Sequence, residues 1–176
     1  MNDSMRQDAI SRVGITIAID GPAGSGKSTV SKALAARLGI GYLDTGAMYR
    51  ALTWYCLDRG IDLADKAAVA AAANEMPLRL VSDPSDPHVW VGEREITEEI
   101  REPRIALEIK HVSTNLDVRA WMAAEQRRRM MEAREEGSGM IAEGRDITTV
   151  VCPDADVRIL LLADQEARLR RRTLEL

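Results

Sequence analysis

A glycine-rich segment early in the chain ends in a lysine and a serine. Residues 21–28 read Gly-Pro-Ala-Gly-Ser-Gly-Lys-Ser and satisfy the pattern GxxxxGK[ST]. Glycines at these positions let backbone N–H groups turn inward around phosphate oxygens. The Lys27 amine can reach the β- and γ-phosphates of a nucleotide, and the Ser28 hydroxyl can bind Mg²⁺. The spacing therefore predicts a nucleotide phosphate site rather than a turn that merely joins two elements.

The residues around this segment predict a strand before it and a helix after it. Residues 15–19 are a continuous apolar and β-branched run, typical of a strand covered on both faces. From Lys27 onward, apolar residues recur four apart, and Gly39 can end the helix. Strand, glycine-rich turn and helix are the context that the phosphate-binding motif requires.

Two further polar clusters each follow a predicted strand. Asp44-Thr45-Gly46 comes after a short strand around Tyr42, and Glu143-Gly144-Arg145-Asp146 comes after an apolar strand at 140–142. If these strands run parallel to 15–19, all three motifs emerge at the carboxyl edge of one sheet, where open α/β folds bind ligands. We therefore expect the clusters to share one site.

The side chains in these clusters suit a phosphorylated substrate. Arg50 lies one helical turn after Gly46 and could point back over the site. Arg145 offers a forked cation for a phosphate, and Asp146 a carboxylate acceptor for an amino group or hydroxyl. Two alternatives stay open: Asp44 or Thr45 as a helix cap, and Arg145 paired with a nearby acid.

The rest of the pattern predicts an α/β fold, a parallel sheet flanked by helices of the P-loop NTPase type, with a small antiparallel insert. Short alternating segments between turn residues form the insert at 77–101, so 14–76 and 102–176 form the core. Strands are expected at 78–81, 89–91, 94–96 and 157–162, and helices at 45–57, 65–76, from 103, at 117–136 and from 165.

Composition excludes several classes of protein. Lys and Arg number 24 against 28 Asp and Glu, and the net charge of −4 argues against a chain that coats nucleic acid or membrane. The chain shows no apolar run of membrane-spanning length and no secretory signal at its start. Cys56 and Cys152 fit no metal or disulfide pattern, so we expect two reduced, buried thiols in a cytoplasmic protein. His88 and His111 lack partner spacing, and we expect structural roles for them.

The last third of the chain offers three weaker signals. Arg127-Arg128-Arg129 is expected to be a solvated helix surface. Asp164 either caps the following helix or holds Mg²⁺ through water, and some of Arg170-Arg171-Arg172 could face phosphates. The final helix has no capping residue before Leu176, so we expect a truncated chain.

Four motifs in this order resemble the bacterial cytidylate kinases, which belong to the nucleoside monophosphate kinases. The segments that carry the resemblance are 17–29 (IAIDGPAGSGKST), 43–50 (LDTGAMYR), 96–101 (ITEEIR) and 143–147 (EGRDI), which leads to Pro153-Asp154-Ala155. The resemblance covers about residues 14–176, beyond which the family continues with a lid and a closing segment. The expected insert resembles the family's monophosphate-binding subdomain.

The resemblance implies transfer of the γ-phosphoryl group of ATP, with Mg²⁺, to CMP or dCMP as a small-molecule substrate. It implies an electrostatic clamp of Lys27, Arg50 and Arg145, with Mg²⁺ on Ser28. The residues implied to cradle ATP are Gly21, Pro22, Ala23, Gly24, Ser25, Gly26, Lys27, Ser28 and Thr29. Those implied to bind the acceptor are Asp44, Thr45, Arg50, Arg119, Arg145 and Asp146, of which Thr45, Arg119 and Asp146 approach the cytosine.

Several alternatives stay open. Lys110 stands where the family usually has a base-contacting Ser, and Ser113 is the alternative register. We expect a monomer that binds no nucleic acid polymer and no membrane. Other interpretations are a P-loop kinase for a different acceptor, a nucleotide-dependent switch, and a nucleotide-binding fragment without turnover. The chain contains no Asn-Lys-x-Asp motif, which weighs against a GTPase.

Overall fold

The computed structural model describes residues 14–162 of the 176-residue chain. Within this range the chain forms two compact units. The first unit comprises residues 14–44, 83–85 and 127–162, and the second comprises 45–82 and 86–126. Predictions for Asp164, for the helix from Gln165 and for the arginines at 170–172 lie outside the described residues.

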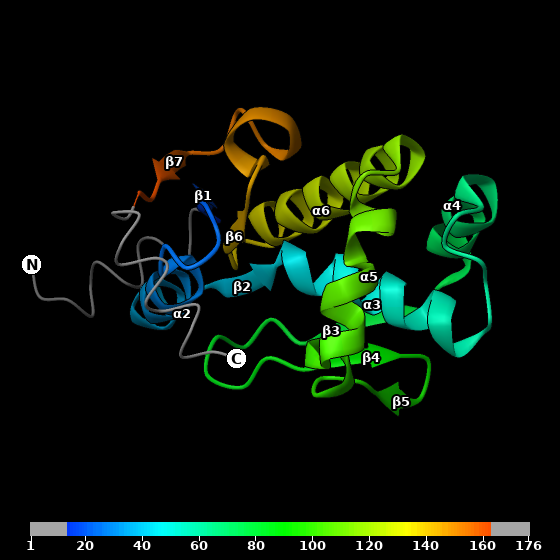
Figure 1. Ribbon diagram of the computed structural model, residues 1–176. Coiled ribbons are helices and arrows are strands. Elements are labelled where there is room, and N and C mark those ends of the chain that lie inside the picture. The colour runs from blue at the N-terminus through cyan, green and yellow to red at the C-terminus, as the bar shows by residue number, and fades with distance from the viewer. Residues whose placement is uncertain (1–13, 163–176) are drawn as a thin grey trace, which may run out of the picture. The chain divides into compact units, whose positions relative to one another are not determined.

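The first unit is built on a four-stranded parallel sheet (Figure 1). Its strands stand in the order β2-β6-β1-β7, which confirms the predicted parallel sheet. Their bounds are β1 Thr16–Asp20, β2 Gly41–Asp44, β6 Met140–Gly144 and β7 Val157–Leu160. Every residue of β1 is buried, and the strand has a neighbouring strand on each side. The continuous apolar run of the sequence therefore marks an inner strand of the sheet.

Helix α2 (Lys27–Leu38) packs against this sheet and begins directly after the glycine-rich turn. Its buried Ala35 joins Ile17, Ile19, Ile40, Tyr42 and Ile141 in the core of the unit. The helix ends as predicted at Gly39, whose φ of 68° is a left-handed conformation that glycine adopts without strain. The Gly39 N–H then bonds the carbonyl groups of Ala35 and Ala36.

Two details of the sheet differ from the prediction. Strand β6 extends to Gly144, so Glu143 lies inside the strand rather than after it, opposite Ile19 of β1 and Asp44 of β2. Strand β7 ends at Leu160, where a strand to residue 162 was expected, and most of its side chains are exposed. It has β1 as its single described neighbour, and this edge position explains the exposure.

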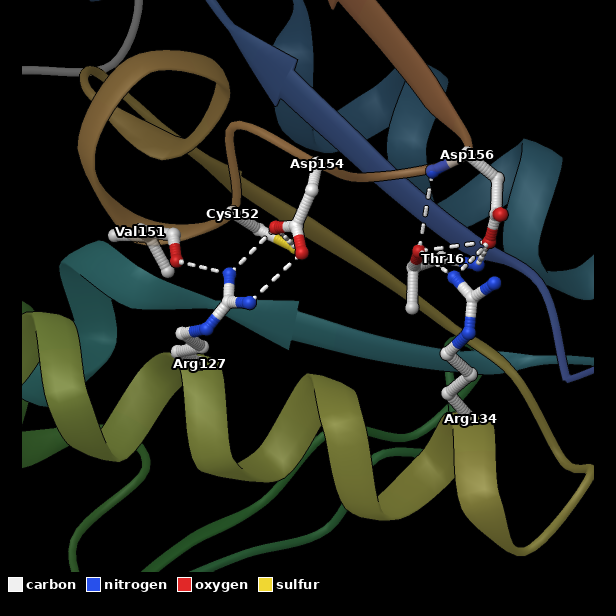
Figure 2. A network of polar contacts seen from close by, with 7 residues as sticks. All are labelled: Thr16, Arg127, Arg134, Val151, Cys152, Asp154 and Asp156. Atoms are coloured by element: carbon white, nitrogen blue, oxygen red, sulfur yellow. Dashed lines mark hydrogen bonds and ion pairs between the residues drawn. The ribbon is translucent and has the colours of Figure 1, made fainter.

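Helix α6 (Leu116–Glu135) contributes residues 127–135 to the first unit, where two arginines bind the turn before β7 (Figure 2). Arg127 donates hydrogen bonds to both carboxylate oxygens of Asp154, at 2.6 and 2.8 Å. Arg134 donates to Asp156 at 2.7 Å. The Arg127 side chain is 40% exposed, so it lies on the solvated surface expected at 127–129 and forms an ion pair there. Its partner lies 27 residues away, so no local pattern could reveal the pair.

The second unit packs helices around α3 (Thr45–Asp58) and adds an antiparallel sheet of the order β3-β4-β5. Its strands are β3 Leu78–Leu80, β4 Val89–Val91 and β5 Arg94–Glu95, at the positions predicted for the insert. The other elements are α4 (Lys66–Glu75), the 3₁₀ turn η1 (Glu99–Arg101), α5 (Pro103–Ser113) and the first part of α6. Asp65 caps α4 through the Ala68 N–H at 3.0 Å.

Two further expectations can be compared with this fold. Cys56 and Cys152 are both free and buried, as predicted. In the part of the chain that the structure describes, no helix is long and apolar enough to cross a membrane.

Candidate active site

Three polar segments begin at the carboxyl edge of the parallel sheet. Strands β1, β2 and β6 run in the same direction, and their paired ends bring Asp20 opposite Gly144 and Asp44 opposite Glu143. The glycine-rich loop, the segment after Asp44 and the Arg145-Asp146 pair therefore start from neighbouring strand ends. This confirms that the three motifs share one edge, which is where open α/β folds bind ligands.

The glycine-rich loop is shaped for close approach to a ligand. Gly24 and Gly26 have φ values of 73° and 87°, which strain any residue with a Cβ. A Cβ on Gly21 would lie 2.4 Å from the Leu161 carbonyl oxygen and 2.9 Å from Ser25 Oγ. Ser25 Oγ itself is buried and has no hydrogen-bond partner among the described residues. The loop is thus a cradle with an unsatisfied polar atom, which suits a bound polyanion.

Lys27 lies within this cradle, in the first turn of α2. Its ammonium group donates to the Pro22 carbonyl at 3.0 Å, so it currently closes back on the loop. Burial lowers the pKa of Lys27, and Arg145 acts in the same direction. Glu143, Asp44 and Asp20 oppose this shift. Arg145 and the three carboxylates are thus close enough to act on the lysine.

Glu143 is a buried carboxyl group at the centre of this edge, with 3% of its surface exposed. It accepts a 2.5 Å hydrogen bond from the Tyr42 hydroxyl, and the Ser28 side chain also bonds it. Burial and the Asp44 carboxylate raise the pKa of Glu143, and its hydrogen bonds oppose the shift. The roles of Glu143 and Tyr42 could not be predicted from the sequence, because their contact joins residues 101 positions apart. Their one local signal is polarity at the end of an apolar run.

The Arg145-Asp146 pair lies between β6 and a π-helical turn, η2 (Ile147–Val151), which the sequence analysis did not predict. The Arg145 side chain is exposed and Asp146 is half-buried. The turn begins with backbone N–H groups that bond Asp20 at the end of β1. The pair is therefore fixed to the strand that precedes the phosphate loop.

The other predicted acceptor residues belong to the second unit. Thr45 is the buried first residue of α3, and Arg50 is half-buried in the second turn of that helix. Arg119 is exposed on α6 and donates to the Ser113 carbonyl at 3.5 Å. Lys110 is exposed on α5, and Ser113 is half-buried at its end. The aligned base-contact position and its register alternative are thus both on one helix.

Most of the chain is similar in sequence to known proteins. The family model for cytidylate kinase matches residues 17–176. A cytidylate kinase of Streptomyces avermitilis is 44% identical over 162 residues, which are 92% of this chain and 69% of that protein. A bifunctional pantoate ligase/cytidylate kinase of Synechococcus sp. is 45% identical over 163 residues, 91% of this chain and 32% of that protein. The crystal structure of TT1252 from Thermus thermophilus aligns with a TM-score of 0.44 at 23% identity, over 91% of this chain and 71% of that one.

Proposed function

The chain belongs to the cytidylate kinase family, and from this premise we propose that it transfers the γ-phosphoryl group of ATP to CMP or dCMP, giving CDP or dCDP. The observation that carries the proposal is the meeting of the phosphate loop with Arg145 and Asp146 at one edge of the sheet. A phosphoryl-transfer enzyme needs a donor phosphate and an acceptor phosphate close together, with cations between them.

ATP fits the loop at residues 21–29. The left-handed glycines leave room for phosphate oxygens, and the orphaned Ser25 hydroxyl gains a partner when a phosphate is present. Lys27 can exchange its bond to the Pro22 carbonyl for one to the β- and γ-phosphates. Loss of that internal bond is offset by a charge-assisted contact.

Mg²⁺ fits the same site, with Ser28 as its protein ligand. The described residues contain no cluster of three His, Cys, Asp or Glu side chains that could hold a metal by themselves. Mg²⁺ usually binds one or two protein oxygens together with substrate phosphates and water, and the Ser28 hydroxyl can be such an oxygen. When bound, the ion supplies neutralisation of charge on the transferred phosphoryl group.

The acceptor side is assigned from the family resemblance and from residue chemistry. Arg50 and Arg145 hold the monophosphate, since a guanidinium group matches two phosphate oxygens at once. Thr45, Arg119 and Asp146 contact the cytosine, and Asp44 completes the binding set. A carboxylate such as Asp146 can accept hydrogen bonds from the cytosine amino group.

The chemistry needs no general base. The acceptor phosphate is already a nucleophile at neutral pH, so catalysis consists of alignment and charge neutralisation. Lys27 and Arg145 supply two of the positive charges, and Arg50 supplies a third. As the phosphoryl group moves, these cations offset the charge on its oxygens, and Mg²⁺ held by Ser28 would add to this neutralisation.

We extend the proposal to the organisation of the enzyme. Residues 77–101 form the monophosphate-binding insert between the core segments 14–76 and 102–176, and the sheet β3-β4-β5 inside that range supports it. The enzyme acts as a monomer. Its place is the reducing cytoplasm, as the free thiols of Cys56 and Cys152 suggest.

The test is a coupled assay of ADP formation from ATP and Mg²⁺. CMP, dCMP, UMP and AMP are supplied as separate acceptors, and calorimetry measures CMP binding in parallel. CMP-preferring turnover is expected. CMP binding without turnover would support the site but not the enzyme activity of this chain, and no binding of any monophosphate would overturn the acceptor assignment.

A further inference from the structure

Asp20 is a buried carboxylate that the family resemblance did not assign to ATP or to CMP. It ends β1, directly before the phosphate loop, and 4% of its surface is exposed. A buried carboxylate is costly unless its oxygens are hydrogen-bonded. Its partners therefore indicate what the residue is for.

The Asp20 carboxylate accepts three hydrogen bonds from the segment that follows Arg145-Asp146. The Ile147 N–H donates to Oδ1 at 2.8 Å, and the Thr148 N–H donates to Oδ2 at 2.8 Å. The Thr148 hydroxyl adds a third bond to Oδ2 at 2.5 Å. A carboxylate offers about four acceptor positions, so most of the acceptor positions of Asp20 are occupied by Ile147 and Thr148.

The other end of the Arg145-Asp146 pair is also tied to the start of the phosphate loop. The Gly21 N–H donates to the Gly144 carbonyl at 3.3 Å, just before Arg145. Both ends of this two-residue arch are thus bonded to Asp20-Gly21. The arch and the loop would have to move together.

Resting on the proposed function, we propose that Asp20 is a positioning residue that holds Arg145 and Asp146 in register with the phosphate loop. The Thr148 hydroxyl contributes to the same positioning, because it donates a further hydrogen bond to Asp20 Oδ2 beside the backbone bonds. We assign Asp20 no direct contact with either substrate. It acts by fixing the backbone on which the acceptor-binding side chains stand.

The neighbouring threonines provide a matched test in the full chain. Thr148→Val removes one hydrogen bond to Asp20, while Thr148→Ser keeps a hydroxyl. Thr149→Val is the control, because Thr149 is exposed and, among the described residues, its hydroxyl bonds the Asp146 carbonyl at 3.5 Å rather than Asp20. Calorimetry gives the dissociation constants of CMP and of ATP separately, and turnover assays give KM and kcat.

For Thr148→Val we expect CMP binding to be weaker by about tenfold or more, because one hydrogen bond to a charged group is lost. ATP binding should change by less than about twofold, because the loop keeps its own bonds. Thr148→Ser should restore CMP affinity, and Thr149→Val should match the wild type. Unchanged CMP affinity in Thr148→Val, or equal weakening of CMP and ATP, would overturn the proposal.

Amide hydrogen exchange separates this inference from the proposed function. Faster exchange at Ile147 and Thr148 in the Thr148→Val variant would support the hold by Asp20 even if the wild type phosphorylates no monophosphate. Unchanged exchange at both amides would overturn it. Failure of the wild type with every acceptor would count against the kinase proposal alone.

Discussion

The Tyr42 hydroxyl donates a hydrogen bond to Glu143 Oε1 at 2.5 Å, across the paired strands β2 and β6. Both side chains are buried. Burial and neighbouring carboxylates raise the pKa of Tyr42, so the phenol stays protonated and remains a donor. The bond gives a buried carboxyl group the partner that it needs at the floor of the candidate site.

Replacing Tyr42 by Phe should therefore lower stability. The ring is kept, but the buried Glu143 loses one of its two side-chain donors, and such a loss costs about 1–3 kcal/mol. Urea unfolding measures the change in free energy. Tyr55→Phe is the control, because Tyr55 is also buried and its ring stacks on Arg59 at 4.5 Å, a contact that Phe retains. Equal losses in the two variants would contradict the prediction.

Gly21→Ala should damage the phosphate loop. The added Cβ would meet the Leu161 carbonyl oxygen at 2.4 Å, and a backbone atom cannot move aside cheaply. We expect a stability loss of about 1–3 kcal/mol and ATP binding weaker by about tenfold or more, since small displacements in such sites are costly. Thermal unfolding and calorimetry measure the two effects.

Gly60→Ala is the matched control for this change. Gly60 has a φ of 65°, so Ala there carries backbone strain, but no atom lies within 4 Å of the added Cβ. It should lose some stability and keep its ATP affinity. Normal ATP binding by Gly21→Ala would show that the close packing of the loop does not matter for the ligand.

Arg145→Ala should weaken acceptor binding while sparing ATP binding. Without the guanidinium, the monophosphate loses a two-point contact, and we expect CMP affinity to fall about tenfold or more. Arg145→Lys keeps the positive charge but not the forked guanidinium, so its CMP affinity should lie between those of the wild type and Arg145→Ala. Arg158→Ala, an exposed arginine on β7, serves as the control. Unchanged turnover in Arg145→Ala would remove this residue from the site.

His88, which directly precedes β4, should make the free energy of unfolding depend on pH. His88 lies 2.5 Å from Glu95 and 3.0 Å from Asp86, and these hydrogen bonds raise the pKa of His88 above 6.5. The same contact lowers the pKa of Glu95 below 4.5. The contribution of His88 is present below pH 6.5 and is lost as pH rises through its raised pKa. That of Glu95 is present above pH 4.5 and is lost on acidification through its lowered pKa.

His88→Asn should therefore differ most from the wild type between pH 4.5 and 6.5 and approach it at higher pH. Chemical unfolding at a series of pH values measures the difference. His111→Asn is the control, because His111 is exposed and lies 3.8 Å from Glu108. A difference for His88→Asn that stays constant across the series would refute the linkage.

The turn before β7 allows a comparison of two aspartates. Asp156 accepts from the N–H and the hydroxyl of Thr16, at 2.9 and 2.8 Å, whereas Asp154 binds Arg127 at the surface (Figure 2). Thr16 is fully buried, so Asp156→Asn disturbs a buried donor and should cost about 1 kcal/mol at pH 7. Asp154→Asn should cost less, since exposed ion pairs contribute little. Urea midpoints rank the two, and the reverse order would contradict this account.

The sequence predicted those parts of the site that lie next to each other in the chain. The glycine-rich loop, its strand and its helix follow from residues 15–39, because periodicity and turn chemistry act over short distances. The sharing of one sheet edge followed from the rule that parallel strands end on the same side. Both were confirmed.

The parts that could not be predicted depend on partners far along the chain. Glu143 is buried through Tyr42, and the π-helical turn after Asp146 is held by Asp20, 127 positions away. The turn itself is rich in β-branched residues and carries no helical periodicity. The carboxylate of Asp20, far along the chain, stabilises the conformation of this turn, and local propensities carry no information about such a contact.

The strand order also bears on the sequence of events during synthesis. The strand β1 precedes the phosphate loop, yet its two neighbours, β6 and β7, begin at residues 140 and 157. On the ribosome, the loop strand must remain without its sheet until those residues have emerged. Contacts of such large sequence separation slow folding and leave apolar strands exposed to aggregation in the meantime. Because β1 is an inner strand, it stays unpaired during synthesis until β6 has been translated. We expect dependence on chaperones to increase with the time between translation of β1 and translation of β6.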